Sequence, residues 1–139
     1  MSGAFAVVRD SVAAAIAAAG LGTYRPHGGY IASDSVPVFF SRMPAVPDRL
    51  IVVTAYPVSI PHTVGVQIRV RGSADATTSA EDLVDDIREA LHGRADLPGI
   101  ELLTWRSGAR IGFDARNRDE MSANFYALVS DPATALYHD

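Results

Sequence analysis

Three carboxylates and four arginines lie close together between residues 106 and 120 of the chain. Asp114, Asp119 and Glu120 carry the hard oxygen ligands that divalent cations prefer, which would suit a metal-dependent enzyme. Guanidinium groups also pair with carboxylates in both geometry and charge, so the same segment fits a docking loop. A solvated connection between two strands is a third interpretation. The arginines are Arg106, Arg110, Arg116 and Arg118.

A second acidic group falls at helical spacing farther upstream. Its members are Glu81, Asp82, Asp85, Asp86 and Glu89. Several carboxylates on one helix face could hold a hard cation, but they also complement a helix N-terminus as an ordinary solvated face. We favour the solvated face, which a neighbouring subunit's arginine could meet.

Other catalytic chemistries lack their residues. The chain has no cysteine and no lysine, which removes thiolate zinc sites, disulfides, thiol catalysis and Schiff-base lysines. The four histidines are too far apart in sequence to form a local ligand pair. We therefore expect no cofactor, no bound metal and no enzymatic activity.

Charge and hydropathy narrow the class of protein further. The formal net charge of −4 argues against a protein that coats nucleic acid, whose binding surface would be basic. No segment approaches the roughly 18 apolar residues that a membrane span needs. The first residues also lack the basic start of a secretory signal. We expect a protein that folds in a cytoplasm and binds no membrane.

These residues need a framework, and apolar periodicity predicts one. A length of 139 residues fits a single domain over 1–139. Thr78 and Glu81 have the spacing of a capping box at the start of the second helix. The predicted elements in order are a helix at 3–19, an irregular arm at 20–48 with a short strand at 36–40, strands at 50–57 and 64–71, a helix at about 79–92, strands near 100–106 and 123–130 with a loop at 107–122 between them, and a C-terminal tail at 131–139.

This order predicts an α+β fold: a two-layer domain with a mostly antiparallel four- to five-stranded sheet and two helices packed on it. Strict alternation in the strand at 64–71 places its β-branched residues on one face. We expect Val66, Ile68 and Val70 to pack beneath the apolar stripe of the second helix. That stripe is Leu83, Ile87 and Leu91.

Several segments resemble the tail-terminator family of long-tailed actinobacterial phages, whose members are often described as minor capsid or neck proteins. The resemblance covers roughly residues 50–130. It rests on the strand Val66–Gly72, an acidic helix that ends Ala90-Leu91-His92-Gly93, the turn Leu97-Pro98-Gly99, and the stretch Ile111–Phe125 with its Gly-x-Asp turn, arginine-rich segment and Ser-x-Asn-Phe strand start.

The resemblance implies a structural virion protein in the neck of the particle, assembled in the host cytoplasm. Such a protein forms a ring, usually of six subunits, that caps the head-proximal end of the tail tube and stops its polymerisation. Its partners are other copies of itself, the tail-tube protein and the head connector, while DNA passes through the lumen without specific binding. A head-side neck or head-completion ring is the nearest alternative.

On this interpretation the charged residues are interface residues. The segment from 106 to 120 would be mobile in isolation, with only Ile111 and Phe113 to anchor it. Removing Arg116 and Arg118 together should then leave the fold intact and disturb assembly. The predicted interface residues are Arg69, Arg71, Asp85, Asp86, Arg106, Arg110, Asp114, Arg116, Arg118, Asp119 and Glu120.

Overall fold

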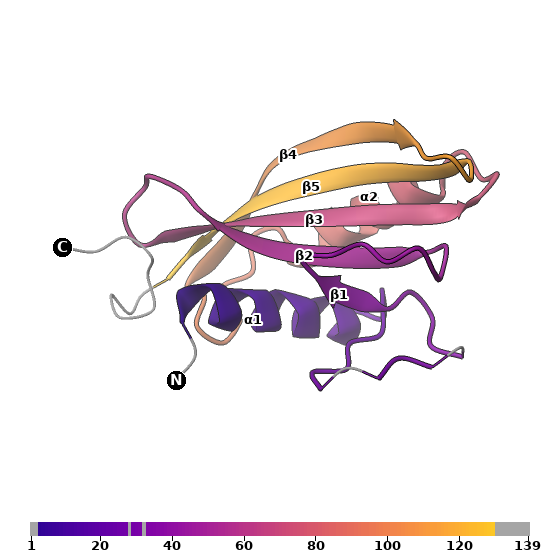
Figure 1. Ribbon diagram of the computed structural model, residues 1–139. Helices are drawn as coiled ribbons and strands as arrows, with labels where there is room; N and C mark the ends of the chain where they lie inside the picture. Colours follow the sequence, from indigo (N-terminus) through magenta and orange to yellow (C-terminus); the bar gives the residue numbers. More distant parts are fainter. Residues whose placement is uncertain (1–2, 28, 32, 130–139) are drawn as a thin grey trace.

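The computed structural model describes residues 3–27, 29–31 and 33–129, which form two helices and one five-stranded sheet (Figure 1). The strand order is β1-β2-β3-β5-β4, and every neighbouring pair is antiparallel except β1 and β2. The predicted α+β class is confirmed, while the predicted tail at 131–139 lies outside the described residues. The elements are α1 (Ala4–Ala18), β1 (Val38–Phe40), β2 (Leu50–Pro57), β3 (Thr63–Ala74), α2 (Ser79–Leu91), β4 (Leu102–Phe113) and β5 (Arg118–Leu128).

Both helices cover the same face of the sheet, because strand alternation directs the apolar side chains of β3 to one side. Val66 and Ile68 are fully buried, as are their β5 partners Phe125 and Ala123. Leu83, Ile87 and Leu91 of α2 belong to the same core cluster, as the sequence predicts. Each large aliphatic side chain buried in this way contributes about 1.5–3 kcal/mol. The opposite face of the sheet is called the open face below.

Helix α1 packs beside α2 on β2 and β3. Val8, Val12 and Ile16 are fully buried at the predicted spacing. The helix ends one residue earlier than predicted, at Ala18, and Gly20 follows with a φ of 77°. Neither helix of the described chain is long and apolar enough to cross a membrane.

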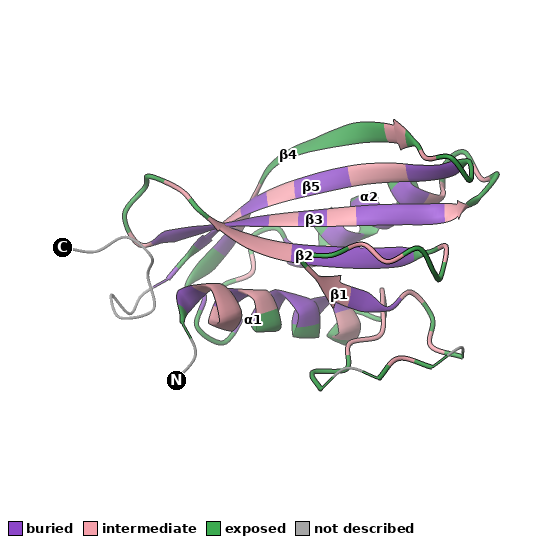
Figure 2. Cartoon of the chain, in the orientation of Figure 1, coloured by how far each residue is buried: buried purple, intermediate pink, exposed green. Residues whose placement is uncertain are grey.

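The predicted loop at 107–122 is wrong. Those residues continue both strands of a hairpin, with Ala109 paired to Ser122 and Arg110 paired to Met121. The turn itself spans only residues 114–117. Strand β4 lies at the sheet edge and is exposed along most of its length, as Figure 2 shows, so its sequence carries no apolar alternation to reveal it. The premise of the expected mobility, an unpaired loop, is wrong for the same reason, since the backbone is paired on both strands.

The predicted capping box is also absent. Thr78 has φ −123° and ψ 4° instead of an extended conformation, and its side chain makes no cap hydrogen bond. The Thr78 hydroxyl bonds to the Asp82 carboxylate at 3.2 Å. Glu81 turns outward and accepts a hydrogen bond from Arg110.

The arm between α1 and β2 is irregular, as predicted, apart from β1 and an isolated bridge between Thr23 and Pro37. Strand β1 runs parallel to β2 at the edge opposite β4. The loop at 41–49 then leads back into β2, and two buried arginines hold it in place.

Candidate interface site

The turn of the β4–β5 hairpin is built around Asp114. Its Oδ1 accepts hydrogen bonds from the backbone N–H groups of Arg116 (3.0 Å) and Arg118 (2.9 Å). The same carboxylate accepts from the guanidinium of Arg118 at 2.9 Å. These hydrogen bonds hold the pKa of Asp114 below its usual value, and the one from the Arg118 backbone N–H has the largest effect. Asn117 adopts the left-handed conformation that closes the turn, with a φ of 58°.

Two buried arginines hold the loop at 41–49, which precedes β2, against the sheet. Arg71 is 3% exposed and donates to the carbonyls of Asp48 (2.8 Å) and Pro47 (2.6 Å). Arg118 is 5% exposed and donates to the carbonyl of Ala45 (2.6 Å) and the carboxylate of Asp48 (3.1 Å). Burial, followed by the nearby charge of Arg118, lowers the pKa of Arg71. We call this pair and its loop partners the arginine clamp.

The arginine clamp corrects one expectation from the sequence. Arg116 is exposed on the turn, so its removal need not affect the fold. Arg118 is a structural residue, because its loss would remove a buried donor from the Ala45 carbonyl and from the carboxylates of Asp48 and Asp114. The two arginines are therefore not equivalent, and the double replacement would also destabilise the fold.

Asp119 and Glu120, adjacent in sequence, point to opposite faces of the sheet. Asp119 is fully buried on the helical side, and its Oδ1 accepts from Arg110 at 2.6 Å while its Oδ2 has no partner. The pKa of Arg110 is raised, mainly by its hydrogen bond to Asp119. The Arg110 guanidinium also donates a hydrogen bond to the Glu81 carboxylate at 3.0 Å. This triad ties the hairpin to α2.

On the open face Glu120 pairs with Arg69 at 2.8 Å, which links β5 to β3. The three carboxylates of the metal hypothesis therefore do not converge on one point. Among the residues that the structure describes, no group of three or more histidine, cysteine or acidic side chains could hold a metal ion. The positions of Asp114, Asp119 and Glu120 therefore do not support the metal-dependent enzyme interpretation.

Four of the predicted interface residues are exposed and make no ion pair within the described part of the chain. Arg106 lies over the ring of Tyr126 on the open face, with its guanidinium carbon 4.8 Å from the ring centroid. The others are Arg116 on the turn and Asp85 and Asp86 on α2. Their role as interface residues stays a prediction.

Away from the Arg69–Glu120 pair, the middle of the open face carries uncharged polar and aromatic side chains. Tyr56 lies directly over Gly65, where a Cβ atom would come within 2.4 Å of the ring. Tyr126 follows on the next strand in the same row. One row farther along, Gln67 and Asn124 are paired. The spacing of β3 predicts which residues lie on this face, but the close fit of Tyr56 on Gly65 has no sequence signal of its own.

Exposed apolar side chains gather at the two ends of the long hairpin. At the turn end, Ile111 and Phe113 are about half exposed and do not anchor the hairpin as expected. At the other end, Leu102 and Leu128 are paired neighbours, and Ile60 lies in the adjacent β2–β3 connection. These two small groups of partly exposed apolar side chains make both ends of the hairpin candidate contact surfaces.

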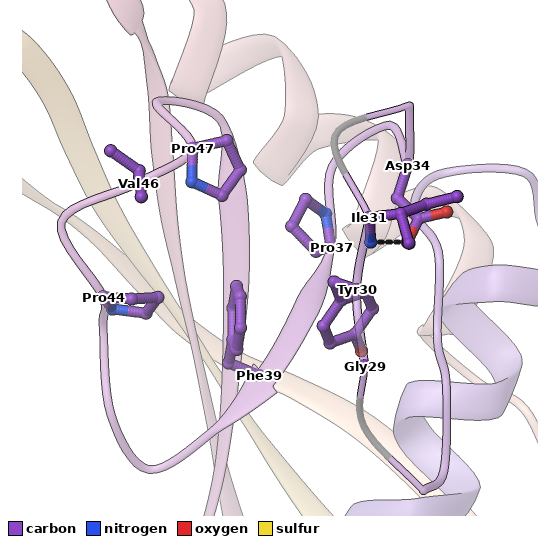
Figure 3. A pocket seen from close by; sticks show the side chains of 9 residues that line it. All are labelled: Gly29, Tyr30, Ile31, Asp34, Pro37, Phe39, Pro44, Val46 and Pro47. Atoms are coloured by element: carbon purple, nitrogen blue, oxygen red, sulfur yellow. Dashed lines mark hydrogen bonds between the residues drawn. The ribbon is translucent and has the colours of Figure 1, made fainter.

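The arm encloses an apolar hollow of about 640 Å³, which Figure 3 shows. The Tyr30 ring packs against Phe39 with centroids 5.0 Å apart, and its hydroxyl donates to the carbonyl of Val38. The Asp34 carboxylate accepts a hydrogen bond from the Ile31 backbone N–H. The pKa of Asp34 is lowered, mainly by its hydrogen bond with the Arg25 guanidinium. The lining residues are Gly29, Tyr30, Ile31, Asp34, Pro37, Phe39, Pro44, Val46 and Pro47.

Sequence reasoning missed this hollow. The prolines and glycines of the arm indicate only an irregular segment. Tyr30, Ile31 and Phe39 are the available signal, because apolar side chains in an irregular segment must either pack together or remain exposed.

Comparison with known proteins identifies a family and a solved structure that are similar to this chain. The family described as bacteriophage tail terminator protein matches residues 15–131, which include α2 and all five strands. A solved chain from the virion of a native gene transfer agent particle has a similar fold, with a TM-score of 0.55 and 15% identity. The alignment covers 68% of this chain and 78% of that one. No protein of curated function matches the sequence.

The family match extends over most of the chain and contains the hairpin, the arginine clamp and the arm hollow. The structural likeness is consistent with it at the level of the fold. The chain belongs to the bacteriophage tail terminator protein family and is a structural protein of the phage virion.

Proposed function

We propose that this protein forms a closed ring, most simply a hexamer, that caps the head-proximal end of the tail tube and stops its polymerisation. One observation carries the proposal: the tail terminator family matches residues 15–131. The ring also joins the tail to the head connector, so its partners are other copies of itself, the tail-tube protein and the connector protein. Its role is structural and not catalytic, and it assembles in the host cytoplasm.

The distribution of exposed side chains supports a ring. A head-to-tail interface needs two different surfaces on each subunit, and it closes into a ring when the rotation between subunits permits. Exposed Arg106 and Arg116 lie on the hairpin, while Asp85 and Asp86 lie on α2. We propose that these two surfaces face each other between neighbouring subunits, with charge-assisted pairs across the interface.

The charge of the chain supports passage of DNA without a tight grip. A lumen lined with unpaired arginines would bind phosphate strongly and hold the genome in place. The net charge is −4, and Arg69 and Arg110 are already paired within the chain. A lumen face on which the arginines are paired in this way would hold DNA weakly.

Electron microscopy of the purified protein, alone and mixed with assembling tail-tube protein, tests this proposal. We expect closed rings alone, and tubes of limited length that carry one ring at a single end. Arg116→Ala should weaken the rings, whereas Arg94→Ala removes an arginine that pairs locally with Asp96 and serves as the matched control.

Tubes that grow to the same lengths with and without the protein would contradict termination. Rings that bind the connector but never the tube would instead identify a head-side neck protein. Both outcomes can be read from the same micrographs.

A further inference from the structure

The arm hollow has the properties of a preformed site for an apolar peptide. Its walls are held by the Tyr30 hydroxyl bond, the ion pair of Asp34 with Arg25 and the arginine clamp on the loop at 41–49. At its mouth Ile31 is 58% exposed and Val46 is 66% exposed. Two exposed aliphatic side chains beside an apolar hollow would both be buried by an occupant that fills it.

A second hollow adjoins the first and adds a positive charge. It measures about 490 Å³ and shares Phe39 and Pro44 with the first. Arg42 lines it, is exposed, and forms no ion pair with another described residue. The composite site therefore fits a short peptide with large apolar side chains followed by a carboxylate.

This chain contains such a peptide beyond its last described strand. Residues 131–139 read Asp-Pro-Ala-Thr-Ala-Leu-Tyr-His-Asp. We infer that the arm hollow receives this segment from a second copy of the chain, with Leu136 and Tyr137 in the apolar hollow and Asp139 beside Arg42. The inference deepens the proposed ring and rests on it.

The length of the segment favours the hollow of a second copy over that of the same chain. The Val129 N–H donates to the His62 carbonyl at 2.8 Å, so the segment starts beside the β2–β3 connection. The hollow lies beside β1, which is three strand positions away from β5 in the sheet. It is level with the start of β2, whereas the β2–β3 connection follows the end of β2. Strand spacing and rise put the two points about 30 Å apart. The seven residues from Val129 to Leu136 span at most about 25 Å when fully extended.

Exchange of this segment suits a closed ring. Each subunit would give its segment to one neighbour and receive one from the other, so every hollow is filled without an open end. The exposed Ile31 and Val46 would then be buried in the assembly.

The absence of cysteine makes a cross-linking test clean, because introduced thiols are the only ones present. One full-length variant carries Ile31→Cys at the mouth of the hollow, and another carries Ala135→Cys. The two proteins are mixed, oxidised and separated on a non-reducing gel. The control pairs Ala135→Cys with Ser107→Cys, which is exposed on β4. We expect about tenfold more heterodimer than in the control, because docking raises the effective thiol concentration.

The outcomes separate this inference from the ring itself. Rings in the micrographs with no excess heterodimer would overturn the exchange and leave the ring intact. A protein carrying both substitutions that cross-links only within single chains would also overturn it, since the segment would then fill its own hollow. An absence of both rings and heterodimer would remove the proposed function along with the inference.

Discussion

The two ends of β3 are stabilised by different physical means. Around Val66 and Ile68 the strand is covered by helices, and burial of apolar surface supplies the stability. Around Arg71 the open face of the strand is covered by a loop whose carbonyls are bound to guanidinium groups. Apolar burial tolerates changes of partner, whereas the arginine clamp depends on a few directed bonds. The first end provides the foundation of the fold, and the second shapes the surfaces that partners meet.

The strongest way to break this comparison is to place a charge in the apolar end. Ile68→Asp buries an unpaired carboxylate among fully buried side chains and should cost more than about 4 kcal/mol, enough to unfold the chain. Gln67→Asp, one residue away on the open face, is the matched control and should change stability by less than about 1 kcal/mol. Urea denaturation measures both, and equal midpoints would contradict the assigned register.

The arginine clamp is tested by replacing one of its members. Arg118→Ala removes donors from the Ala45 carbonyl and from two carboxylates and should cost about 2–4 kcal/mol. Arg116→Ala, two residues earlier and exposed, should cost less than about 0.5 kcal/mol. Hydrogen exchange of the loop at 41–49 should accelerate in the first variant only. Equal stability of the two variants would contradict a structural role for Arg118.

The smallest expected effect concerns pH. The hydrogen bonds of Asp114 keep its folded pKa below its ordinary value of 3.8, so the carboxylate stabilises the fold above that value. This contribution is lost as pH falls through the folded pKa. Asp114→Asn keeps an acceptor for the turn but cannot titrate. Between about pH 5 and pH 2 its stability should therefore fall less steeply than that of the parent. Parallel pH profiles would show that Asp114 does not contribute.

Sequence reasoning predicted the apolar end and missed the other for one physical reason. Burial leaves a periodic trace, so α1, α2, β2 and β3 follow from spacing alone. The central part of β4 shows no such apolar period, because Ser107, Gly108 and Ala109 lie on an exposed edge strand. Composition showed that arginines gather near the hairpin, but a count of charges does not show which are buried. The sequence therefore proposed these charged residues as a group and did not sort them into buried and exposed members.

The arginine clamp connects two separate surfaces of the subunit, the hairpin turn and the arm hollow. Arg118 follows the hairpin turn, and through Ala45 and Asp48 it holds a loop that carries two walls of the arm hollow. The hairpin turn and the arm hollow are therefore connected through this one loop. By linkage, an occupant that favours the clamped position of this loop would stabilise the clamp by the same free energy that the clamp adds to its binding. We expect a subunit with an occupied hollow to hold its loop at 41–49 against Arg118 more tightly than a subunit with an empty one.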